Sequence, residues 1–440
     1  MNFKRFTAGV LAAATVFAAS ASISDNGVSL FADKAITAEA ATNYEEVVYG
    51  NLRYTLNPNK KVAELSGVNY QPLENLKIHN EVIWHGVTYK VKSIKNNAFK
   101  DNGYLKTVDL SCAEEIDTIP SGAFQGCKKL AKVSFPPKIK YILSSAFENT
   151  PLECAKVGSI SNNDNTVTIP NTVTTIGMNA FKDCKKIKNL VFEATSSSSF
   201  SNLMVSTHAF MNNTGLRNVT FNRKDFKTAR DIFEGSYTYD ASTKKNTAFT
   251  CDGSAAPDYV RNIYKMLLSE WGLSFNKSAS EDAQKKFFND LQVKLSQYMK
   301  RGDYEIQSQE GCAATVISLK MGTCGGFARV FYEMCLQAGV PESNILFAGD
   351  NHCHAWNYVK AGDLWYNIDA SNNIGLCGCD EFITKMNFDR GVEEHDPHNW
   401  IASVKNSISA DDQNHVTKKF DAFFESGSEW EISYSGSRVW

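Results

Sequence analysis

Residues 118–135, TIPSGAFQGCKKLAKVSF, contain the pattern that decides the fold of the first half of the chain. The same spacing of apolar and small residues recurs four times: at Ile119, Ala123, Phe124, Leu130, Val133, Phe135; at Ile94, Ala98, Phe99, Leu105, Val108, Leu110; at Ile176, Ala180, Phe181, Ile187, Leu190, Phe192; and at Val205, Ala209, Phe210, Leu216, Val219, Phe221. A compressed copy stands at Ile142, Ala146, Phe147 and Leu152, and Asp231-Ile232-Phe233 is interpreted as a degenerate last copy. The phenylalanines follow one another at 25, 23, 34 and 29 residues, so the repeat has insertions.

Each copy holds a short apolar alternation, such as Val133-Ser134-Phe135, which suits a strand with one buried face. No copy buries its phenylalanine alone, so the copies are predicted to stack into a solenoid.

The pattern resembles the BspA-type leucine-rich repeats of bacterial surface proteins. The resemblance covers residues 45–275, with an atypical N-terminal cap and a closing segment at 251–275. A β-rich domain with accidental similarity is the alternative. The repeats imply binding of a protein or surface ligand.

The N-terminus has the features of a secretory signal peptide. Lys4 and Arg5 precede an apolar run at 6–19. Small residues at 19–21 suit a cleavage that removes residues 1–21 as the signal peptide. A second small-residue site allows cleavage as late as 40. The run is shorter than the roughly 20 apolar residues that a membrane span needs, and no later stretch suffices. We expect a secreted or cell-surface protein without a membrane span after signal removal. The net charge of -2 favours no nucleic-acid partner.

The chain has 11 cysteines, an odd number, so at least one thiol is expected to stay free or to pair between chains. Cys127 and Cys184 occupy equivalent places in the repeat, which favours small buried side chains over disulfide partners.

A second domain is predicted at 277–440. Apolar residues at helical spacing predict a helix at 281–299, and another that begins at Cys324 and stops at Gly339-Val340-Pro341. At a helix start, unpaired N–H groups and the helix dipole lower the pKa of a cysteine and stabilise an oxyanion. Gly325 and Gly326 let a substrate backbone approach closely. The alternative is a buried structural cysteine.

Two alternating stretches downstream, His354–Val359 and Leu364–Asp369, predict a β-hairpin. If Ala361 and Gly362 form a two-residue loop, His354 lies directly opposite Asp369, with Cβ atoms about 4.5–5.5 Å apart. A four-residue loop gives the same register. An imidazole needs such a carboxylate to fix its tautomer and to stabilise its charged form.

The blocks GTCGGFARVFYEMCLQAGVP, HCHAWNYV and LWYNIDAS together resemble the transglutaminase-like superfamily over about residues 277–375. The resemblance implies an α+β, papain-like fold. It also implies that Cys324 is the nucleophile, His354 the general base and acid, and Asp369 the orienting carboxylate, with Gly325, Gly326 and Trp356 contacting the substrate. No cofactor is implied. The family's oxyanion side chain has no certain match, and Gln307 and Gln309 are the candidates.

A metal site is the rival interpretation of this region. His352, Cys353 and His354 with Cys377 and Cys379 have zinc-ligand types, but the spacing is unusual and Cys353 points away from the two histidines. We therefore predict no metal. A polar group at His395, Asp396 and His398 is interpreted as solvated.

Two functions of different classes follow. In the first, Cys324 forms a thioester with a protein or peptide and passes the acyl group to water, giving hydrolysis or deamidation, or to an amine, giving Gln–Lys crosslinks. The second is a non-catalytic adhesin or scaffold in which both domains bind partners.

Overall fold

The computed structural model describes residues 44–69, 72–161, 164–195, 202–228, 231–242, 245–302, 313–349, 354–378, 381–382 and 385. All of them belong to the compact unit Thr42–Trp440. The predicted signal peptide, with both of its cut sites, lies outside these residues. Among the helices within these ranges, none has the length and apolar character that a membrane crossing requires.

The chain before the repeats forms a sheet of its own, with the order β1-β2-β3-β6-β5. Its strands are β1 (Glu45–Tyr49), β2 (Leu52–Asn57), β3 (Val62–Val68), β5 (Glu81–Trp84) and β6 (Val87–Ile94). Buried and half-buried residues alternate along β3, as expected for a strand with one face on a core. Where the sequence predicted an atypical cap, the chain therefore builds a separate mixed sheet.

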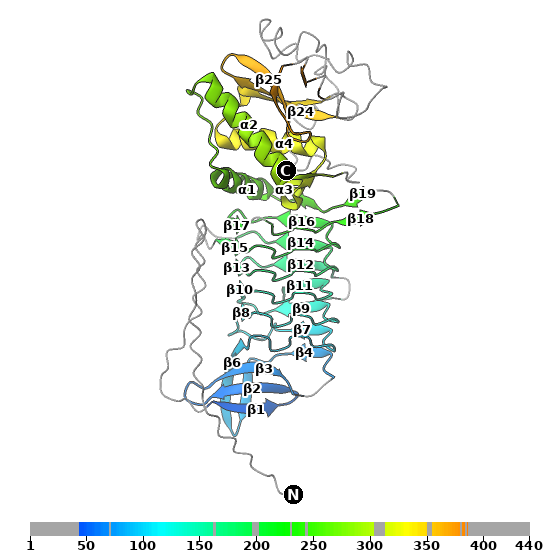
Figure 1. Ribbon diagram of the computed structural model, residues 1–440. Coiled ribbons are helices and arrows are strands. Elements are labelled where there is room, and N and C mark those ends of the chain that lie inside the picture. The colour runs from blue at the N-terminus through cyan, green and yellow to red at the C-terminus, as the bar shows by residue number, and fades with distance from the viewer. Residues whose placement is uncertain are drawn as a thin grey trace, which may run out of the picture. The chain divides into compact units, whose positions relative to one another are not determined.

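The repeats fold into two parallel sheets that run side by side, one strand of a copy in each (Figure 1). The longer sheet, in the order β20-β16-β14-β12-β11-β9-β7-β4, contains β4 (Asn75–Lys77), β7 (Thr107–Asp109), β9 (Lys132–Phe135), β11 (Cys154–Val157), β12 (Thr166–Ile169), β14 (Asn189–Phe192), β16 (Asn218–Phe221) and β20 (Thr250–Asp252). The shorter sheet, in the order β17-β15-β13-β10-β8, contains β8 (Thr118–Ile119), β10 (Tyr141–Ile142), β13 (Thr175–Ile176), β15 (Leu203–Val205) and β17 (Phe226–Thr228). A hairpin of β18 (Thr238–Asp240) and β19 (Lys245–Thr247) stands apart from both. The predicted solenoid is confirmed.

The longest phenylalanine spacing has a structural cause. Between Phe147 and Phe181 the chain places two strands, β11 and β12, in the longer sheet before it returns to the shorter one. The two strands pair in parallel through Ala155 and Val167. The insertion adds a strand to the sheet and leaves the stack of phenylalanines continuous.

The repeated phenylalanines form one column through the solenoid core. Successive rings, from Phe99 through Phe124, Phe147, Phe181 and Phe210, lie 5.3, 5.5, 5.3 and 5.0 Å apart between centroids and are nearly parallel. Phe233 continues the column 5.6 Å from Phe210, which confirms the degenerate last copy. Stacked aromatic pairs contribute about 0.5–1.5 kcal/mol each beyond their burial.

Each turn beside a phenylalanine contains two residues of positive φ, four positions apart. The pairs are Asn97 and Asp101, Gly122 and Gly126, Ser145 and Asn149, Asn179 and Asp183, His208 and Asn212, and Asp231 and Gly235. Most of these are the types that tolerate the left-handed region. Gly122 is also held by a close approach, because a Cβ there would lie 2.1 Å from Oδ1 of Asn97 in the preceding copy.

The repeat cysteines are buried thiols, as predicted. Cys127 donates to the carbonyl of Phe99 at 3.0 Å, and Cys184 donates to the carbonyl of Phe147 at 3.1 Å. Burial raises the pKa of both thiols to about 12. They therefore tie one copy to the preceding copy and stay protonated at neutral pH.

The C-terminal part combines helices with an antiparallel sheet of order β23-β24-β25-β26. Its elements are α1 (Ala256–Trp271), α2 (Glu281–Tyr298), β21 (Lys300–Arg301), α3 (Ala313–Leu319), β22 (Met321–Gly322), α4 (Cys324–Ala338), η1 (Glu342–Asn344), β23 (Ile345–Gly349), β24 (Ala355–Ala361), β25 (Leu364–Asp369) and β26 (Ile374–Cys377). Helices α2 and α4 both pack against the sheet. Both predicted helices are confirmed, and Gly339, at φ 100°, ends α4.

Helix α1 was not predicted, because its residues were interpreted as the closing segment of the repeats. Helix α1 does close the repeats, because its Tyr259 stacks on Phe221 of β16 with ring centroids 4.2 Å apart. Its hydroxyl also hydrogen-bonds to Ser318 of α3 at 2.8 Å. Thr315 of α3 donates to the carbonyl of Phe249 at 2.9 Å. The helical part is thus built directly on the end of the repeat core.

Candidate active site

Cys324 is the first residue of α4. Thr323 caps the helix, and its side chain accepts a hydrogen bond from the Gly326 N–H at 3.4 Å. The thiol is half-buried, and the backbone N–H of Ala355 donates to it. The sulfur therefore lies between the N-terminus of α4, which carries a partial positive charge, and the start of β24.

His354 immediately precedes β24 and bonds to the carboxylate at the end of β25. Its Nε2 lies 2.7 Å from Oδ2 of Asp369, and both side chains are almost fully buried. The imidazole also hydrogen-bonds to the Cys324 thiol. Because Nε2 is engaged with Asp369, Nδ1 is the ring nitrogen left for the thiol. The structure therefore joins the three predicted residues in one chain of contacts.

The register that we predicted for the hairpin is wrong by one residue. The two-residue loop is Gly362-Asp363, since Ala361 pairs with Leu364 and Asn357 pairs with Ile368. Continued by one pair, this register places Trp356, and not His354, opposite Asp369. His354 and Asp369 remain on the same face as diagonal neighbours, because a shift of one residue in each strand preserves the side-chain parity. The contact forms in spite of the shifted loop.

The thiol and the imidazole favour their charged forms. Burial raises the pKa of Cys324, but the hydrogen bond and charge of His354, together with the Ala355 N–H, outweigh it and lower that pKa below its ordinary value. Burial lowers the pKa of His354, but the bonds and charges of Asp369 and Cys324 raise it to about 9. Both shifts favour a thiolate beside an imidazolium, the reactive form of a cysteine nucleophile.

Asp369 stays charged although it is buried. Burial raises its pKa, while the hydrogen bond and charge of His354 and the bonds from Ser371 lower it. Oδ1 accepts the Ser371 backbone N–H and hydroxyl at 2.8 and 2.7 Å, and Oδ2 accepts the Asn372 side-chain amide at 2.9 Å. Ser371 and Asn372 were not predicted as supports of the site. An Asp followed two and three residues later by Ser and Asn is a local turn signal that could have indicated them.

The three residues predicted to contact a substrate all lie near this site. Gly325 and Gly326 are buried in the first turn of α4. Trp356 is 2% exposed, stacks on His354 with ring centroids 5.8 Å apart, and donates its indole N–H to Oδ1 of Asn367 at 3.0 Å. These contacts make Trp356 a buried support of His354, and substrate contact by any of the three stays a prediction.

Several predicted polar residues fall outside the described part of the chain. They are Gln307, Gln309, His352, Cys353, Cys379, His395, Asp396 and His398. Cys377, the remaining cysteine of the rival zinc set, is buried on β26.

Another group of metal-ligand types lies on the repeats, where one ligand atom each of His208, Asp231 and Glu234 falls within 4.8 Å of the others. His208 contacts Glu234 at 3.3 Å, and the Lys320 ammonium contacts Asp231 at 2.5 Å. Glu234 and Asp231 thus each contact a basic side chain, His208 and Lys320 respectively.

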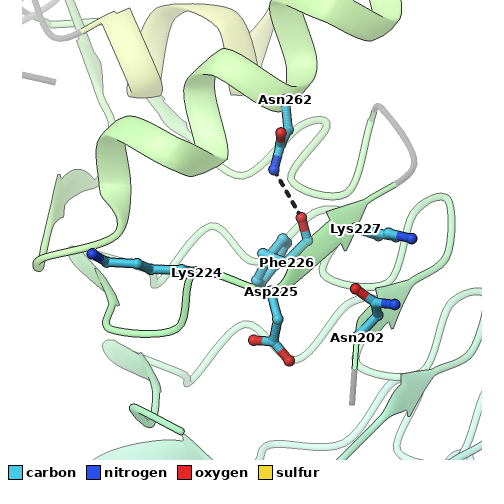
Figure 2. Close-up of a pocket in the computed structure, with 6 residues that line it drawn as sticks. All are labelled: Asn202, Lys224, Asp225, Phe226, Lys227 and Asn262. Atoms are coloured by element: carbon cyan, nitrogen blue, oxygen red, sulfur yellow. Dashed lines mark hydrogen bonds between the residues drawn. The ribbon is translucent and has the colours of Figure 1, made fainter. Parts of the chain in front are cut away.

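A surface pocket of about 410 Å³ lies apart from the candidate catalytic residues, where β17 meets α1. Figure 2 shows its lining residues, which are Asn202, Lys224, Asp225, Phe226, Lys227 and Asn262. Asn262 donates to the carbonyl of Phe226 at 3.0 Å, and Asp225 is held by the buried guanidinium of Arg223. Two of the lining residues, Asn262 and Asp225, are thus engaged with other parts of the fold.

Residues 80–166 and 161–247 match the family described as "BspA type Leucine rich repeat region", in six copies. This part of the chain is therefore a BspA-type leucine-rich repeat region, which confirms that resemblance. The matched residues include none of Cys324, His354 and Asp369, so the transglutaminase-like resemblance stays a prediction. A comparison with curated proteins found no match.

Three solved structures are similar to the repeat part of the chain. A leucine rich cell surface protein from Faecalibacterium prausnitzii is 16% identical, over 48% of this chain and 55% of that one, with a TM-score of 0.29. The pneumococcal vaccine antigen PcpA is 18% identical, over 47% and 48%, with a TM-score of 0.31. The leucine rich repeat protein of T. pallidum is 18% identical, over 43% and 89%, with a TM-score of 0.30. The chain spans about half the length of the first of these.

Proposed function

We propose that the chain is an exported or cell-surface, cysteine-dependent acyl-transfer enzyme with a transglutaminase-like, papain-like C-terminal domain beside a repeat region that binds a protein or surface ligand. The observation that supports it most is the contact chain Cys324–His354–Asp369, in which the pKa of the thiol is lowered and that of the imidazole is raised. A buried structural cysteine has the opposite property, as Cys335 of the same helix illustrates, since burial alone raises its pKa well above the ordinary value.

The proposed reaction begins when the Cys324 thiolate attacks the carbonyl carbon of a peptide or glutamine side chain. The partial positive charge of the N–H groups at the start of α4 stabilises the resulting oxyanion. The C–N bond breaks as the His354 imidazolium gives its proton to the leaving nitrogen, and a thioester remains on Cys324. Water or an amine then loses a proton to His354 and attacks the thioester, which releases the acyl product and restores the thiolate. Asp369 holds the imidazole and stabilises its charge throughout.

The second candidate is the non-catalytic adhesin or scaffold. The family match favours this function, because it lies in the repeats alone and repeat solenoids present extended binding surfaces. In this case the C-terminal part is a second binding module. The intact contact chain around Cys324 argues for the enzyme, since a binding module has no need of a thiol whose pKa is lowered.

One experiment distinguishes the two functions. The full chain is incubated with a mixed peptide library, with and without a primary amine, and products are analysed by mass spectrometry. We expect cleaved, deamidated or amine-coupled peptides from the wild type and none from Cys324→Ala. Cys112→Ala, which removes the exposed thiol of the repeats, is the matched control and should keep full activity. Products that persist in Cys324→Ala, or no product from the wild type, would leave the binding function.

A further inference from the structure

One carboxylate oxygen of Asp369, Oδ2, is shared between His354 and a second side chain. Oδ2, the oxygen that bonds to His354 Nε2 at 2.7 Å, also accepts the side-chain amide of Asn372 at 2.9 Å. Oδ1 accepts the Ser371 hydroxyl and two backbone N–H groups, those of Ser371 and Asn372. The backbone donors and Ser371 hold one oxygen, so the placement of the oxygen that faces the imidazole depends on Asn372.

Asn372 is itself held by a residue from another element. Its Oδ1 accepts Nη1 of Arg301 at 2.6 Å. Arg301 belongs to β21, which pairs in parallel with β22, so that Arg301 stands beside Gly322, two residues before Cys324. The Gly302 N–H donates to the Gly322 carbonyl at 3.1 Å and continues this pairing.

These contacts form a closed ring of interactions around the site. One arm runs from Cys324 through His354 to Asp369, and the other runs from the backbone before Cys324 through Arg301 and Asn372 to the same Oδ2. An asparagine suits the junction because its amide donates with one end and accepts with the other. A guanidinium on the oxygen and a carboxylate on the nitrogen fix which way the amide points.

We propose that Asn372 is a positioning residue for the His354–Asp369 pair and that Arg301 orients it. This inference rests on the proposed function. Loss of the Asn372 amide leaves the charge of Asp369 satisfied through Oδ1 but frees Oδ2 to leave the plane of the imidazole. The imidazolium then spends less time aligned with the Cys324 sulfur, and the thiolate loses part of its stabilisation.

The test measures the rate at which iodoacetamide alkylates Cys324 across pH, read site by site in the full chain by mass spectrometry, so it requires no known substrate. In the wild type we expect a thiol that stays reactive well below the ordinary pH range of cysteine. In Asn372→Ala we expect the rate at pH 6 to fall about tenfold and the titration to move upward. Arg301→Ala should shift the profile in the same direction by about two- to threefold, and Lys300→Ala, on the same exposed strand, should leave it unchanged.

The outcomes separate this inference from the proposed function. An ordinary titration of Cys324 in the wild type would overturn the function and the inference together. An acidic thiol in the wild type that is unaltered in both Asn372→Ala and Arg301→Ala would overturn the inference alone. If Asn372→Ala does not fold, as judged by circular dichroism, Arg301→Ala decides, because its exposed side chain can be removed without opening a cavity. Once a substrate is identified, kcat should fall in Asn372→Ala while KM stays near its wild-type value.

Discussion

His354 links the chemistry of the site to pH, because its imidazole contacts both the nucleophile and the carboxylate. The thiolate–imidazolium pair exists above the lowered pKa of Cys324 and below the raised pKa of His354, which is about 9. Activity is therefore expected to rise as Cys324 loses its proton and to fall again as the pH passes about 9 and His354 loses its own. A plateau between these limits in kcat/KM against pH would support this assignment.

Replacing Asp369 by Asn tests the cause of the raised His354 pKa. The amide removes the negative charge, so the alkaline limit should move down from about 9 towards the ordinary histidine range, and kcat should fall by at least about 10²-fold. The measurement is the pH dependence of turnover in Asp369→Asn beside wild type. An unchanged alkaline limit would mean that another group titrates there.

Trp356 contributes stability at the same place. Its indole N–H bonds to Oδ1 of the fully buried Asn367, so Trp356→Phe leaves a buried acceptor without its donor. We expect the free energy of unfolding in urea to fall by about 1–3 kcal/mol. Trp365→Phe, which removes an indole of the same sheet that does not bond to Asn367, serves as the control and should cost less.

At the scale of elements, the repeat turns depend on backbone conformation as much as on apolar burial. Gly122 has φ +63° and faces Oδ1 of Asn97 so closely that a Cβ would clash. Gly122→Ala should therefore destabilise the solenoid by more than about 1 kcal/mol. Gly103→Ala, where nothing lies within 4 Å of the added atom, is the matched control and should change thermal unfolding little. Equal effects of the two substitutions would contradict the requirement at Gly122.

The sequence predicted some elements correctly and others only in part, for physical reasons. The Ala-Phe pairs predicted the copies because burial of each ring demands the same offsets each time. The left-handed positions beside them escaped notice, since Asn97, Gly122, Ser145 and His208 share a conformation and no side-chain chemistry. Helix α1 was missed because its apolar face covers the repeats, and its apolar residues were therefore interpreted as the closing segment of the repeats.

The hairpin illustrates a limit of a different kind. Gly362 suits positive φ in either two-residue loop, so residue types alone did not choose between them. Both loops keep His354 and Asp369 on one face, so the pair was predictable although the register was not. The support from Asn372 is local, three residues from Asp369. The contact of Arg301 with Asn372 joins chain segments about 70 residues apart, and a single sequence gives no signal for such a contact.

At the scale of the whole molecule, the repeats and the catalytic candidates share one packed region. Tyr259 of α1 stacks on Phe221 of the repeats and bonds to Ser318 of α3, and it is fully buried. Tyr259→Ala should lower the free energy of unfolding by about 3–5 kcal/mol. Because α1 joins both parts, calorimetry of the wild type should show one transition that covers repeats and C-terminal part together. Two well-separated transitions would contradict this coupling.

The central claim, that Cys324 carries an acyl group during turnover, is tested most directly by trapping that group. The protein is mixed with the peptide library, quenched in acid within seconds, and its intact mass and Cys324 peptide are measured. We predict a mass increase of one acyl unit on Cys324 that hydroxylamine removes, as a thioester requires, and that is absent in His354→Ala. A Cys324 peptide that keeps its unmodified mass at every quench time, while peptides in the library are being converted, would contradict the claim.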